Sequence, residues 1–61
     1  MSTLRADLKK DLAGEVKAIR DYTKRAGDAR LSVRDKSIIQ EILKDEKSHY
    51  GLITRMLERI K

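Results

Sequence analysis

The stretch KDEKSHY, residues 44–50, sets a carboxylate and an imidazole three residues apart, at Glu46 and His49. Side chains at positions i and i+3 of an α-helix lie on the same face. The apolar residues around this stretch recur at alternating intervals of three and four, as they do on the buried face of a helix. With the two polar residues included, the row reads Ile39, Ile42, Glu46, His49, Ile53, Met56 and Ile60. We therefore expect Glu46 and His49 on a buried face, where a carboxylate needs a compensating charge.

The composition favours helices over strands. The chain has no proline, and Ala, Leu, Lys, Arg, Glu and Asp dominate it. Ser2 or Thr3 can cap a first helix that spans about residues 3–26, and Gly27 suits the C′ position at its end. These signals predict an all-α fold that begins with one long helix.

A second helix is predicted over about residues 33–60. It follows Ser32, which forms with Asp35 a Ser-x-x-acid pattern similar to a capping box. Asp28 is the alternative cap, and its use would move the start of the helix toward the N-terminus. In either case the link is short, so the sequence predicts an antiparallel helical hairpin, a single domain over residues 1–61.

The first helix carries its own apolar row, in which Glu15 is the one charged member. The row reads Leu8, Leu12, Glu15, Ile19, Tyr22 and Ala26, and it is widened by Leu4 and Val16. Glu15 lies twelve residues before Gly27 and Glu46 lies fourteen after Ser32, so at about 1.5 Å of rise per residue their heights differ by only a few Å. Glu15 and Glu46 are therefore expected to face each other across the hairpin.

The size of the chain points to a dimer. With 61 residues and no cysteine, tryptophan or phenylalanine, a single core is marginal. A lone hairpin would also leave much of its apolar face in water. A two-fold axis through the middle of the hairpin would close this face as a four-helix bundle and bring a second set of Glu15, Glu46 and His49 to the same level. We therefore expect a homodimer that completes both the core and the site.

Two copies of the chain would supply four carboxylates and two imidazoles. One glutamate from each first helix and a Glu-x-x-His pair from each second helix form the ligand set of ferritin-like di-iron and di-manganese bundles. Four negative charges neutralise two divalent cations, and imidazole with carboxylate oxygens suits Fe, Mn or Zn. The lack of cysteine excludes thiolate zinc sites and iron–sulfur clusters.

Two motifs relate this ligand set to a known family. Glu15 is followed seven residues later by Tyr22, and the second motif is DEKSH, residues 45–49. With these motifs, the chain from about residue 8 to residue 57 resembles the ferritin-like superfamily, in particular the rubrerythrin-type domains and the encapsulated ferritins. The resemblance implies half of a ferritin-like bundle that is completed by dimerisation, homo-oligomers built from such dimers, and an encapsulin-type protein shell as a further partner.

The same resemblance implies roles for individual residues. Glu15, Glu46 and His49 would be the metal ligands and the catalytic residues of a dinuclear iron centre formed between two chains. Tyr22 matches a tyrosine near the metals, and Asp45 matches an acidic residue that hydrogen-bonds a ligand histidine. The implied activity is ferroxidase-type iron oxidation for iron handling, or peroxide detoxification. Fe, Mn and Zn all remain open as the resting metal.

The competing interpretation is a non-enzymatic hairpin dimer that binds RNA or acts as an adaptor. The net charge of +5 favours it. The fifteen basic residues are interleaved with ten acidic ones, however, and only two tyrosines are available to stack on bases, so nucleic acid is the less favoured partner. A simpler alternative is that the site residues form surface ion pairs with Lys17, Arg20 or Lys47.

The remaining sequence features bear on location and on two glycines. No apolar run approaches the roughly 20 residues of a membrane span, and residues 1–10 lack the apolar stretch of a secretory signal. The lack of cysteine makes a reducing compartment the default, so we expect a cytoplasmic protein, or one inside a protein compartment.

Gly14 and Gly51 each cost their helix about 1 kcal/mol relative to alanine. Close helix approach, or room beside the site, would explain them.

Overall fold

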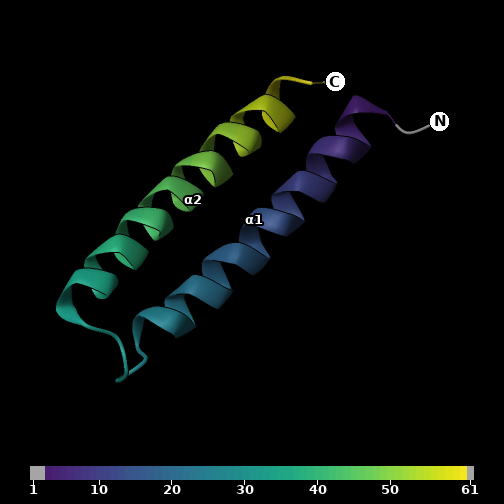
Figure 1. Cartoon of the computed structure of the whole chain (residues 1–61). Coiled ribbons are helices and arrows are strands. Elements are labelled where there is room, and N and C mark those ends of the chain that lie inside the picture. The colour runs from purple at the N-terminus through teal and green to yellow at the C-terminus, as the bar shows by residue number, and fades with distance from the viewer. Residues whose placement is uncertain (1–2, 61) are drawn as a thin grey trace.

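The computed structural model describes residues 3–60, and it consists of two α-helices joined by a short link (Figure 1). Helix α1 spans Leu4–Ala26 and helix α2 spans Val33–Arg59. They lie side by side and antiparallel, so the start of α1 and the end of α2 are at the same end of a molecule that measures 45 × 18 × 12 Å. The predicted all-α hairpin is confirmed, and its assembly into a four-helix bundle stays a prediction.

Side-chain caps define where both helices begin. The hydroxyl of Thr3 accepts a hydrogen bond from the backbone N–H of Ala6 at 3.1 Å, so Thr3 is the N-cap of α1. The alternative cap, Ser2, lies outside the described residues. The hydroxyl of Ser32 accepts a hydrogen bond from the N–H of Asp35, also at 3.1 Å, and caps α2. Each cap satisfies an amide that has no partner inside its helix.

The link between the helices is organised by Asp28. Its carboxylate accepts hydrogen bonds from the backbone N–H of Arg30 at 2.9 Å and from the Arg30 guanidinium at 2.6–3.2 Å. Asp28 therefore shapes the turn and does not cap α2. Gly27 ends α1 as its C-cap with φ −87° and ψ 1°. The expected C′ role for Gly27 is thus wrong, because the left-handed conformation that favours glycine there is not used.

The contact between the helices is narrow. Among residues 3–60, only Leu8 and Ile39 are buried. Most other members of the two apolar rows are half-buried, while Met56 and His49 are exposed. This exposure agrees with the expectation that a lone hairpin leaves much of its apolar face in water, and burial of the whole row of α2 in a dimer stays a prediction. Each helix packs against only one other helix. Because the apolar row follows intervals of both three and four residues, it is too wide for one neighbouring helix to cover.

The open end of the hairpin is tied together by Arg5. Its Nη1 atom donates hydrogen bonds to the backbone carbonyl of Ile60 at 3.1 Å and to that of Leu57 at 3.4 Å. These carbonyls belong to the end of α2, where the helix offers them no amide partners. Arg5 also places a positive charge at the C-terminal end of α2, which the helix dipole favours.

The two helical glycines are not explained by packing inside the hairpin. A Cβ atom built at Gly14 or Gly51 would meet nothing within 4 Å. Close approach of α1 to α2 therefore does not require either glycine.

Neither helix, within residues 3–60, is long and apolar enough to cross a membrane.

Candidate metal centre

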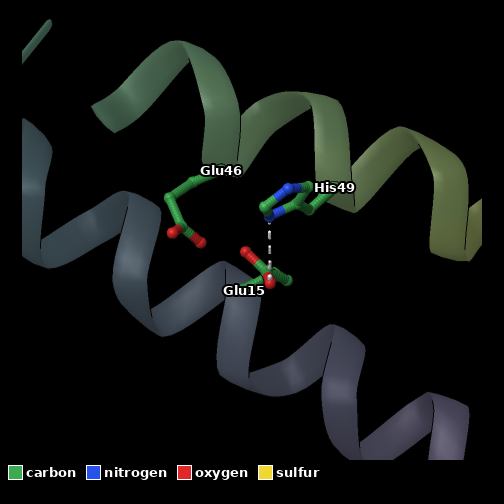
Figure 2. A group of neighbouring side chains, drawn as sticks. All are labelled: Glu15, Glu46 and His49. Atoms are coloured by element: carbon green, nitrogen blue, oxygen red, sulfur yellow. Dashed lines mark ion pairs between the residues drawn. The ribbon is translucent and has the colours of Figure 1, made fainter. Parts of the chain in front are cut away.

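The middle of the hairpin brings together the three predicted ligand residues. Glu15 projects from α1, while Glu46 and His49 project from successive turns of α2, and the three side chains converge between the helices (Figure 2). One ligand atom from each residue can be chosen so that all three atoms lie within 4.8 Å of one another. The expected opposition of Glu15 and Glu46 is what the hairpin shows, because the short link aligns residues at similar distances from it.

Glu15 is a half-buried member of this group, which we call the ligand cluster. Its side chain is 20% exposed, and its Oε2 atom is buried without a hydrogen-bond donor among the described residues. A hydrogen bond with the Glu46 carboxyl group raises the pKa of Glu15, and burial and the negative charge of Glu46 act in the same direction. The positive charge of His49 opposes this shift. The hairpin therefore holds Glu15 where an ionised carboxylate lacks a partner.

His49 lies at the rim of the ligand cluster. Its Nδ1 atom is 3.8 Å from Oε1 of Glu15, and its side chain is 56% exposed. The sequence predicted that His49 is buried once a second chain completes the site. In the single hairpin, Glu46 is half-buried and His49 is exposed, so burial of His49 in a dimer stays a prediction. The cluster is thus closed toward the interior of the hairpin and open to solvent at His49.

The donor atoms of the ligand cluster lie close to the spacing that a divalent cation requires. Two donor atoms that are each about 2.1 Å from one ion stand at most about 4.2 Å apart. The separation of Nδ1 of His49 from Oε1 of Glu15 is within this limit, while the three-atom group as a whole spans up to 4.8 Å. Two carboxylates and an imidazole are donors that Fe, Mn and Zn accept. A cation would also give the buried Oε2 atom of Glu15 the partner it lacks.

Tyr22 and Asp45 lie outside the ligand cluster. Tyr22 is half-buried and is seven residues from Glu15 along α1, which corresponds to about 10 Å at 1.5 Å of rise per residue. It lines a shallow groove beside Gly14 and Ala18. Asp45 is exposed and faces away from Glu46, its neighbour in the sequence. Within one hairpin, neither residue completes the cluster, so their assigned roles stay predictions.

The surface ion pairs found here do not neutralise the cluster. Lys17 was one of the cations that could have paired with it, but its Nζ atom lies 2.9 Å from Asp21. Arg20 and Lys47 are exposed. The ion pair found at Glu15 is the one with His49, which carries a charge only when protonated. Among the described residues, no lysine or arginine forms an ion pair with Glu15 or Glu46.

Comparisons with known proteins add no relative to this description. No protein-family model matches the chain, and no match was found among curated proteins or solved structures. The resemblance to the ferritin-like superfamily therefore rests on the residues and their spacing.

Proposed function

We propose that this chain is a di-iron carboxylate protein that binds Fe(II) at a site shared between two copies and oxidises it with O2 or peroxide. One observation carries the proposal. A buried carboxylate oxygen of Glu15, without a hydrogen-bond donor among the described residues, faces a second carboxylate and an imidazole. Two carboxylates beside an imidazole are tolerated in a protein interior when a cation neutralises the carboxylates.

The charge balance supports two metals and two copies of the chain. One hairpin contributes the carboxylates of Glu15 and Glu46 and the imidazole of His49. A second hairpin doubles this set, and its four carboxylates balance two divalent cations. A second hairpin would also cover the exposed side of His49 and the exposed apolar residues of α2. The proposal therefore places the complete site at a homodimer interface. The same donor atoms can also bind Mn or Zn.

The residues of the ligand cluster have separate tasks in this proposal. Glu15 and Glu46 bind the metal with their carboxylates, and metal binding competes with protonation of Glu15, whose pKa is raised. His49 binds the metal with its imidazole from the rim of the ligand cluster. Iron, when bound, supplies the electron-transfer chemistry. Ile42 and Ile53, which lie one turn before Glu46 and one turn after His49, are half-buried.

Iron oxidation by matched variants tests this proposal. Fe(II) is added to the wild type, Glu46→Ala and Glu41→Ala without oxygen, and the ultraviolet absorbance of the ferric product is followed after oxygen is admitted. Glu41 is an exposed glutamate of α2 outside the cluster. We expect the wild type and Glu41→Ala to oxidise iron rapidly up to about one iron per chain. Glu46→Ala should show only slow oxidation without such a limit. Equal oxidation by Glu46→Ala and the wild type would contradict the proposal.

A further inference from the structure

Helix α2 carries a second row of residues, which shares Ile42, His49 and Met56 with the first row and is turned away from the side that packs against α1. We call this row the outer stripe, and its members are Ile38, Ile42, Asp45, His49, Leu52 and Met56. They recur at intervals of four and three residues, the spacing by which one helix packs along another. Most members come directly before a residue that packs against α1, as Ile38 comes before Ile39, so the stripe lies about 100° around the helix from that contact.

Five of the six members of the outer stripe are exposed, and Ile42 is half-buried. Ile38 is 48% exposed, Leu52 is 55% exposed and Met56 is 43% exposed. The side chain of His49, between them, is 56% exposed. A row of large apolar side chains in water, at the spacing of a helix contact, marks an interaction surface for another helix.

The order of residues in the outer stripe identifies that helix as a second α2. The members are placed at equal distances on either side of Lys47. From Lys47 toward the N-terminus, the stripe reads Asp45, Ile42 and Ile38. Toward the C-terminus, it reads His49, Leu52 and Met56. Each direction therefore gives one polar residue followed by two apolar ones, so the stripe is complementary to itself when turned end to end.

Charge selects the antiparallel arrangement. In a parallel pair about a two-fold axis each residue meets its own copy, so Asp45 would face Asp45 and His49 would face His49. In the antiparallel pair, Asp45 faces the partner's His49, and a carboxylate beside an imidazole is favourable. The apolar members then meet one another, with Ile42 against the partner's Leu52 and Ile38 against the partner's Met56.

We propose that two copies of this chain pair through the outer stripe, with their α2 helices antiparallel and the two-fold axis at the level of Lys47. This proposal adds to the proposed function the face through which the two copies bind and the register of that contact. It rests on the proposed function only for the claim that pairing completes the metal centre. Glu46 and His49 lie within about 3 Å of rise from Lys47. The two ligand clusters therefore arrive at the same level in the pair.

Disulfide trapping tests the register, because the chain has no cysteine of its own. Ile38→Cys and Met56→Cys are prepared as separate variants with tags of different size, mixed, and oxidised gently. The control mixture is Ser37→Cys with Arg55→Cys, whose exposed residues each precede a stripe position and have the same separation along α2. All four positions are exposed, so the hairpin should fold in each variant, which circular dichroism verifies.

We expect the mixture of Ile38→Cys and Met56→Cys to give a disulfide-linked heterodimer in several-fold excess over each variant alone and over the control mixture. Trapping is done with a chelator and with Mn(II), and a heterodimer in either condition supports the pairing. A heterodimer that binds no Mn(II) would overturn the shared metal centre and leave the pairing intact. Dominant linkage of Ile38→Cys to itself, or a wild type that sediments as a monomer in both conditions, would overturn the pairing.

Discussion

Glu15 shows how one residue connects the packing of this hairpin to its chemistry. It occupies a position in the apolar row of α1 where an aliphatic side chain would pack well. The buried Oε2 atom and the nearby Glu46 carboxyl group both disfavour its charged form. An ionised Glu15 is therefore a source of instability in the metal-free chain and a source of affinity for a cation.

The stability of the metal-free chain should depend on the ionisation of Glu15. The pKa of Glu15 is raised in the hairpin, so the folded chain binds this proton more tightly than the unfolded chain does. Stability should then fall as the pH rises past the ordinary value of 4.5, until it passes the raised pKa. Glu15→Gln removes this titration and keeps a neutral group beside Glu46. We expect its unfolding temperature in chelator, measured by circular dichroism, to fall less over this pH range.

Glu41→Gln is the matched control for this measurement, since it removes an exposed carboxylate of α2 outside the ligand cluster. It should follow the pH profile of the wild type. Parallel profiles for the wild type and Glu15→Gln would show that burial of Glu15 has no energetic consequence.

The cluster itself could be predicted from the sequence, but the exposure of His49 could not. The heights of Glu15 and Glu46 follow from counting residues along two helices to a short link. Periodicity shows that a side chain belongs to the apolar side of a helix, but it does not show which neighbour covers it. His49 satisfies the periodic row and yet lies beyond the edge of α1. The burial of His49 depends on a neighbouring chain, and the periodicity of the sequence does not give the position of that chain.

At the level of the helices, local polar residues decide the boundaries. The Ser-x-x-acid pattern correctly predicts the start of α2, because the Ser32 hydroxyl satisfies a free amide in the first turn. Gly27 does mark the end of α1, but its conformation could not be predicted. The alternative cap, Asp28, instead forms a turn with Arg30, and α1 ends without a left-handed residue.

The Ser32 cap should have a measurable effect on stability. Ser32→Ala leaves an amide of the first turn of α2 without its side-chain partner, and we expect a loss of about 1 kcal/mol. Ser37→Ala is the control, because Ser37 is exposed within α2 and alanine has a higher helix propensity. Urea unfolding at one protein concentration measures both. An equal free energy of unfolding for Ser32→Ala and the wild type would show that α2 does not depend on this cap.

At the scale of the whole molecule, burial is too small to stabilise the hairpin alone. Leu8 and Ile39 are the buried side chains of residues 3–60, and full burial of such a side chain stabilises by about 1.5–3 kcal/mol. Covering the outer stripe with a second copy would add apolar burial to that of the half-buried rows.

This reasoning predicts that the unfolding temperature of the wild type rises with protein concentration, because association stabilises the folded chain by mass action. Leu52→Gln places a polar group in the middle of the outer stripe, so it should weaken this dependence. Val33→Gln is the matched control, since Val33 is 88% exposed and lies outside the stripe. Thermal unfolding is followed by circular dichroism over a wide range of concentrations. A wild type whose unfolding temperature does not change with concentration, or equal effects of the two substitutions, would show that the stripe is solvent-facing surface and that the hairpin is stable without a partner.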